Sequence, residues 1–95
     1  MEVTKIFSVD VCRDGGSYSL SFESNDNEWY ELFVQVKGIG SNEYREPAIY
    51  KRGVNDGELI QVLTWESAHT FLASLKYESS RLIELKRLVE CNCIT

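Results

Sequence analysis

Residues 59–75, which read LIQVLTWESAHTFLASL, decide the fold, because the spacing of the apolar residues changes within them. Up to Leu63 the pattern is typical of a short strand, and from Trp65 the apolar residues recur about every 3.6 positions, as in a helix with one apolar face. Thr64 is an acceptable N-cap, and Glu66 lies in the first turn, where the helix dipole favours an acid. This stretch therefore predicts a strand at 59–63 followed by a helix of about 11 to 13 residues. The predicted apolar stripe of the helix comprises Trp65, Ala68, Phe71, Leu72 and Leu75.

Upstream of this stretch the apolar residues alternate with polar ones, which predicts strands at 3–12, 17–23 and 29–36. Gly15 and Gly16 supply the turn after the first strand, and residues 24–27 supply the turn after the second. Large apolar residues occupy both faces of the third strand, which favours a central position. A fourth strand is expected within 44–51. Pro47 cannot donate a ladder hydrogen bond, so we expect this segment at a sheet edge or across a bulge.

Downstream, the helical pattern is interrupted at residues 77–80 and then resumes. A continuous helix over 65–91 would be about 40 Å long, which exceeds the width of a chain of this size. We therefore predict two helices, with Ser79 or Ser80 capping the second, and a strand at 82–85 is the alternative. The sequence as a whole predicts a single α+β domain over residues 1–95, in which an antiparallel β-meander of about five strands precedes C-terminal helices packed on one face.

Composition and charge narrow the possible functions. The 95 residues carry a net charge of −5, and all of the excess acid lies in residues 1–60, where eleven acids face six bases. This charge argues against nucleic acid as a partner and favours a basic protein. We expect no membrane segment and a cytoplasmic location, because the chain has no long apolar run and no signal-like N-terminus. Three cysteines, Cys12, Cys91 and Cys93, are too few for a disulfide framework.

Catalytic and cofactor motifs are not recognisable in the sequence. His69 is the single histidine, and it falls on the polar side of the predicted first helix. Cys91 and Cys93, with Cys12 and His69, include zinc-ligand types but lack a second close-spaced pair. The glycines at 38 and 40 do not form a nucleotide-binding loop, since no helix is predicted after them. We therefore predict no enzyme activity, no catalytic residues, no cofactor and no metal.

The most distinctive segment is 23–31, ESNDNEWYE, which contains four acids, no bases and two aromatic residues. One interpretation is a hairpin loop kept hydrated by its acids, with both aromatic side chains returning to the core. The other is a protein-binding patch with an aromatic anchor and acids that steer a basic partner, extended by the loop before Pro47. The predicted partner-binding residues are Glu23, Asp26, Glu28, Trp29, Tyr30, Glu31, Glu43, Tyr44 and Glu46.

Three segments together resemble the small immunity proteins of bacterial polymorphic and contact-dependent toxin systems. These are the run from Gly16 to Phe22 with the acidic turn after it, the run from Glu31 to Gln35, and Leu63-Thr64 at the start of a helix. The resemblance covers residues 10–75. It implies a cytoplasmic antitoxin, a non-catalytic toxin inhibitor that binds one cognate toxin domain, such as a basic nuclease, as a monomer or homodimer.

Three other functions fit the same residues. One is a phage-encoded inhibitor of a host defence nuclease that acts as an acidic mimic. Another is a small ligand-binding domain or enzyme with a pocket between sheet and helices, lined by polar groups such as His69, Tyr18 or Glu31. The third is an oligomerisation module that pairs copies through an exposed edge strand at 44–51.

Overall fold

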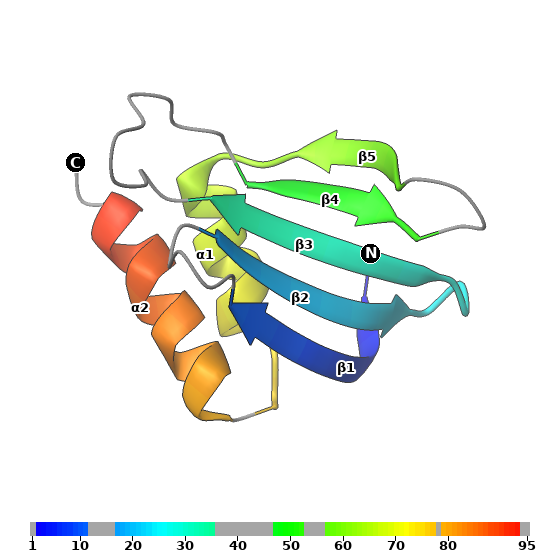
Figure 1. Cartoon of the computed structure of the whole chain (residues 1–95), viewed down its shortest axis with the longest axis horizontal. Helices are drawn as coiled ribbons and strands as arrows, with labels where there is room; N and C mark the ends of the chain where they lie inside the picture. The colour runs from blue at the N-terminus through cyan, green and yellow to red at the C-terminus, as the bar shows by residue number, and fades with distance from the viewer. Residues whose placement is uncertain (1, 12–16, 36–46, 53–56, 78, 94–95) are drawn as a thin grey trace.

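Five antiparallel strands form one sheet, and two helices follow them (Figure 1). The computed structural model describes residues 2–11, 17–35, 47–52, 57–77 and 79–93. Its strands are β1 (Val3–Val11), β2 (Ser17–Ser24), β3 (Trp29–Gln35), β4 (Ala48–Lys51) and β5 (Glu58–Val62), and its helices are α1 (Trp65–Ala73) and α2 (Ser80–Cys93). The order across the sheet is β1-β2-β3-β4-β5, so each strand pairs with its neighbour in sequence. This confirms the predicted α+β meander with C-terminal helices.

Serine and threonine side chains set the starts of both helices. Thr64 accepts a hydrogen bond from the backbone N–H of Ser67 at 3.0 Å, as an N-cap does. Ser79 accepts one from the N–H of Leu82 at 3.2 Å, which confirms the predicted pair of helices and excludes the alternative strand at 82–85. Helix α1 has nine residues and is shorter than predicted. It ends at Ser74, where the backbone N–H of Leu75 donates to the carbonyl of Leu72 at 3.2 Å in the tighter pattern of a 3₁₀ turn.

The fourth strand is interior, so the predicted edge position was wrong, and the register shift beside it has its extra residue at Ile60 of β5 and not at Pro47. β4 pairs with β3 on one side and β5 on the other, and the register shifts between Ile49 and Tyr50. Pro47 immediately precedes the strand, so its missing N–H costs no ladder hydrogen bond. Its carbonyl accepts the N–H of Leu63 at 2.7 Å and extends the pairing of β4 with β5. Residues 44–46 of the predicted strand lie outside the described residues.

The core lies between one face of the sheet and the two helices. Leu20, Leu32 and Ile49 are neighbours across β2, β3 and β4, and all three are buried. The ring of Phe22 lies 5.4 Å from that of Phe71, which joins the sheet to α1. The helices contribute Ala68, Leu72, Leu82, Leu85 and Val89 to the cluster, and Leu75, just after α1, is also buried in it. The helices thus cover one face of the sheet, and no helix or strand of the described residues packs on the opposite face.

Candidate partner-binding surface

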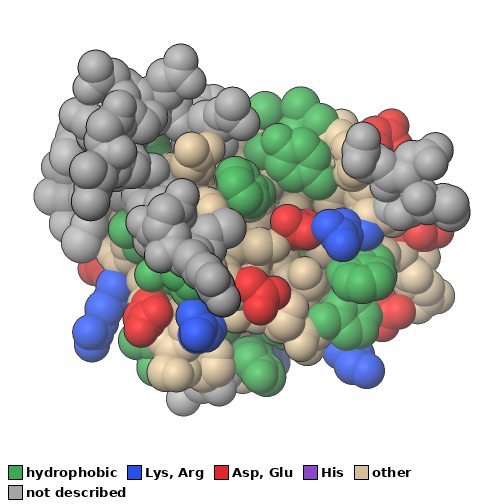
Figure 2. Space-filling model, viewed as in Figure 1, with side chains coloured by type: hydrophobic (Ala, Val, Ile, Leu, Met, Phe, Trp, Pro, Cys, Tyr) green, Lys and Arg blue, Asp and Glu red, His purple; other side chains and the backbone are tan. Residues whose placement is uncertain are grey.

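The uncovered side of the sheet, called the open face below, carries side chains that alternate with those of the core. Strand pairing places Trp29 beside Glu23, Glu31 beside Ser21 and Phe33 beside Ser19 on this face. On β4, Tyr50 pairs with Glu31 and continues the row toward β5. Figure 2 looks onto this side and shows hydrophobic groups gathered over β3 to β5 and again near the turn between β2 and β3, with an acidic and a basic side chain between them.

An aromatic and cationic cluster occupies one end of the open face. The rings of Phe7 and Trp29 meet edge to face with their centres 5.3 Å apart. Lys5 Nζ lies 5.5 Å from the centre of the Phe7 ring, and Arg52 Cζ lies 5.5 Å from that of Trp29. Arg52 Nη1 also donates to Glu31 Oε2 at 2.9 Å. These five residues form what we call the Trp29 cluster.

The Trp29 cluster is exposed although its members contact one another. Phe7 is 45% exposed and Trp29 46% exposed. The two rings come from β1 and β3 and meet across β2. An aromatic pair held in place by two cations is a rigid apolar group that loses little conformational entropy when another protein covers it.

A shallow hollow adjoins the Trp29 cluster on the open face. It has a volume of about 260 Å³ and is lined by Glu31, Phe33, Tyr50, Arg52 and Gly57. A Cβ atom at Gly57 would lie 3.4 Å from Cβ of Tyr50, so glycine at this position helps to keep the rim of the hollow low. The hollow places a carboxylate, a guanidinium and two aromatic rings within reach of one inserted side chain.

The turn between β2 and β3 uses its central acid for folding. Asp26 Oδ1 accepts the N–H of Glu28 at 3.0 Å, and the Tyr30 hydroxyl donates to Asp26 Oδ2 at 2.5 Å. Asn27, with φ of 64°, adopts the left-handed conformation that asparagine tolerates in turns. The hydrogen bond from Tyr30 and that from Glu28 hold the pKa of Asp26 below its usual value. The same carboxylate raises the pKa of Tyr30 to about 12.

The two aromatic residues of the segment 23–31 lie on opposite faces of the sheet. Tyr30 is buried, 6% exposed, and stacks on Phe22 with ring centres 5.9 Å apart. Trp29 points to the open face. Tyr30 thus returns to the core, as the hairpin-loop interpretation expected of both residues, and Trp29 is the aromatic side chain that a partner could contact.

The acids that we predicted to bind a partner differ in burial and in whether they pair with a cation of the same chain. Glu31 is paired with Arg52, and Glu28 lies 3.9 Å from Lys51 Nζ with both side chains largely exposed. Glu23 is half-buried beside Trp29. The structure therefore brings Glu23, Trp29 and Glu31 together on the open face, whereas Glu28 contacts Lys51, which pairs with Tyr30 on the opposite face. The remaining predicted residues, Glu43, Tyr44 and Glu46, lie outside the described residues.

Sequence reasoning missed several residues of this surface. Phe7, Arg52, Phe33 and Tyr50 were assigned to strands or turns and not to a site. Alternation within each strand could have placed Phe33 on the same face as Trp29. No local signal could have brought Phe7 to Trp29, because β1 shifts register between Ile6 and Ser8. A bulge of this kind changes which residues share a face.

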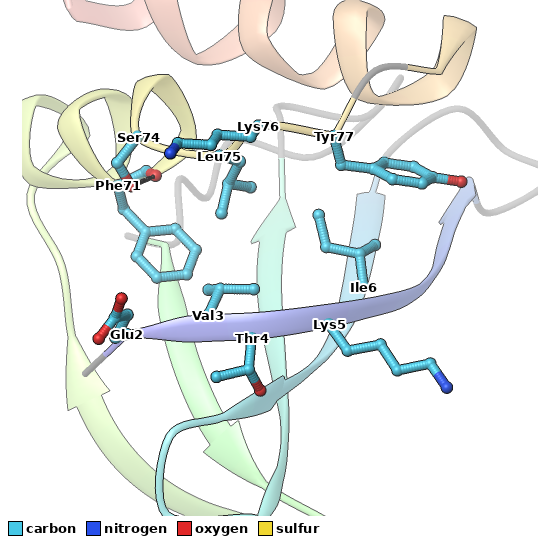
Figure 3. Close-up of a pocket in the computed structure, with 10 residues that line it drawn as sticks. All are labelled: Glu2, Val3, Thr4, Lys5, Ile6, Phe71, Ser74, Leu75, Lys76 and Tyr77. Carbon is cyan, nitrogen blue, oxygen red and sulfur yellow. Dashed lines mark hydrogen bonds between the residues drawn. The ribbon is translucent and has the colours of Figure 1, made fainter.

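A second and larger hollow lies beside β1, under the end of α1 (Figure 3). Its volume is about 760 Å³. Val3 and Ile6 point into it from β1, and Phe71 and Leu75 point toward them from the helical side, whereas Lys5 points away. His69, Tyr18 and Glu31, which we named as possible polar groups of a pocket, do not line it. His69 is exposed on α1.

Three further features bear on the functional predictions. Within the described ranges, no cluster of three or more His, Cys, Asp or Glu side chains could hold a metal ion. The side chains of Cys12, Cys91 and Cys93 are outside the part of the chain that the structure describes. Neither α1 nor α2 is long and apolar enough to cross a membrane.

No protein-family model, curated protein or solved structure matches this chain.

Proposed function

We propose that this protein is a non-catalytic inhibitor that binds another protein through the open face of its sheet. The immunity proteins that the sequence resembles provide the biological role, in which the partner is a basic toxin domain inside the producing cell. The observation that carries the proposal is the Trp29 cluster, an exposed aromatic pair flanked by two cations on a sheet face that the helices leave bare.

The composition of the cluster fits a binding hot spot. Tryptophan and arginine are enriched among the residues whose truncation most weakens protein complexes, and such residues tend to lie beside a pocket that excludes water. Arg52 lies over the Trp29 ring and also lines the hollow together with Tyr50. A partner side chain that entered this hollow would be surrounded by aromatic and charged groups that already hold their positions.

Charge keeps the steering role that the sequence indicated, but fewer free acids are available to supply it. Glu31 and Asp26 already have partners within the chain, so neither presents a free carboxylate at the surface. Glu28 makes only a long, exposed contact and adds to the net charge of −5. The acids would therefore accelerate the encounter with a basic partner, while the Trp29 cluster supplies most of the affinity.

The test first asks whether a toxin-type domain is encoded beside this gene, and absence of one would count against the immunity role. Binding to that domain is then measured by calorimetry and inhibition by a toxin activity assay. Trp29→Ala should weaken binding by about 30-fold or more, as loss of a hot-spot residue does. Tyr77→Ala is the matched control, because Tyr77 is 48% exposed and lies near the other hollow. Unchanged binding by Trp29→Ala would reject the open face as the site. Lack of binding by wild-type protein would reject the immunity role.

A further inference from the structure

Strand β5 is an edge of the sheet that the described strands form. It pairs with β4 on one side, and no described strand lies on its other side (Figure 1). All five of its residues are exposed. Three of them are large and apolar, with Leu59 53% exposed, Ile60 43% exposed and Val62 50% exposed. An apolar edge with unpaired backbone groups favours the addition of another strand.

The opposite edge of the sheet, β1, differs from β5 in the features that prevent such pairing. β1 has two register shifts along its length and carries Lys5 on the open face. Bulges and lysine residues are both common means of preventing edge strands from associating. β5 has one register shift, at which Ile60 has no Cα partner in β4, and it contains neither lysine nor proline. Of the two edges, β5 is the one suited to pairing.

We propose that β5 pairs with β5 of a second copy of this chain, in antiparallel orientation about a two-fold axis. When two five-residue strands overlap fully in this way, Ile60 meets its copy at the centre and Glu58 lies opposite Val62. The two Glu58 residues are then about 14 Å apart along the strands, which is beyond the screening length at physiological salt. Parallel pairing would place them side by side. The single charge of β5 is thus compatible with an antiparallel copy.

The composition of β5 favours a copy over a different protein. Selection of a charged partner requires complementary charges on the edge, and Glu58 is the one charged residue of β5. A two-fold axis perpendicular to the sheet also keeps the two open faces on the same side. Leu59 and Val62, which pair with Tyr50 and Ala48 on the open face, would then form one apolar strip with their copies. The pairing would join the two sheets into one.

The expected dimer is weak. A five-residue strand covers much less than the roughly 800 Å² per partner of a standard interface, so it should dissociate on dilution into the micromolar range. Each copy carries a charge of −5, so added salt should strengthen the dimer by screening repulsion. This direction is opposite to the salt dependence expected for binding of a basic toxin, which keeps the two proposals distinguishable.

The experiment is sedimentation velocity on the full chain from about 1 µM to about 1 mM, with the fold of each variant checked by circular dichroism. Ile60→Lys places like charges together at the centre of the pairing and should weaken the dimer by at least about tenfold. Ile60→Ser, which adds no charge, should weaken it less. Ile83→Lys is the matched control, since Ile83 on α2 is 44% exposed, and it should leave the dimer unchanged. A wild-type protein that is monomeric throughout, or a dimer that persists in Ile60→Lys, would overturn the proposal.

Discussion

The variants Leu32→Ala and Trp29→Ala truncate side chains on opposite faces of the sheet, and we expect them to lose different amounts of the free energy of unfolding. Leu32 is fully buried in the central strand, with Leu20 and Ile49 as its cross-strand neighbours. Truncation there leaves a cavity that these packed neighbours cannot fill, so we expect a loss of about 3 to 4 kcal/mol in the free energy of unfolding. This is a large part of the roughly 5 to 15 kcal/mol typical of a domain.

Trp29→Ala should cost much less, although tryptophan is the larger side chain. Trp29 is 46% exposed, and its contacts are one edge-to-face ring pair with Phe7 and one cation–π contact with Arg52. Such contacts contribute about 0.5 to 1.5 and about 0.5 to 1 kcal/mol, respectively, at exposed sites. We therefore expect Trp29→Ala to lower the free energy of unfolding by about 1.5 kcal/mol.

Urea denaturation followed by far-UV circular dichroism measures both effects on one scale. With a denaturant slope of about 1 kcal/mol per molar urea, the midpoint should fall by about 3 M for Leu32→Ala and by about 1.5 M for Trp29→Ala. Equal losses in the two variants would mean that Trp29 is a core residue, which would contradict its assignment to a free binding face. A loss below about 1 kcal/mol for Leu32→Ala would contradict the proposed core.

Two further predictions concern the turn and the second helix. Folding lowers the pKa of Asp26, so the stabilisation from this carboxylate is present above its unfolded pKa near 3.8 and is lost as the pH falls below that value. Folding raises the pKa of Tyr30 to about 12, so the stabilisation from the Tyr30 hydroxyl is lost as the pH rises from about 10 through 12. Tyr30→Phe should flatten both dependences in pH-dependent thermal melts, and wild-type slopes in that variant would contradict the assignment. Ser79→Ala should lower stability by about 1 kcal/mol through loss of the cap, whereas Ser80→Ala, at an exposed neighbouring position, should change it little; equal losses would count against Ser79 as the cap.

The order of the strands and helices could be predicted because the necessary signals are local. Alternation of apolar residues depends on strand geometry within a few residues, and the change of period after Leu63 marks the first helix. Thr64 and Ser79 act on backbone groups three positions away, so the sequence indicated the role of Thr64 and narrowed the second cap to Ser79 or Ser80. Pro47 shows what such local signals cannot predict. Its missing N–H constrains the hydrogen bonding of one residue and does not indicate whether the strand that follows lies at the edge of the sheet.

The candidate site depended on information that no single segment contains. Sequence alone identified Trp29 and the acids around it, and it determined that the chain forms a meander followed by helices. The tertiary structure decided which aromatic residue of the pair 29–30 is exposed, because the helices cover the face that carries Tyr30. It also decided that Phe7 and Arg52 meet Trp29, since that contact depends on strand pairing and on a bulge in β1. Pairing and register arise from contacts between residues far apart in the chain, so only the folded sheet shows which side chains share a surface.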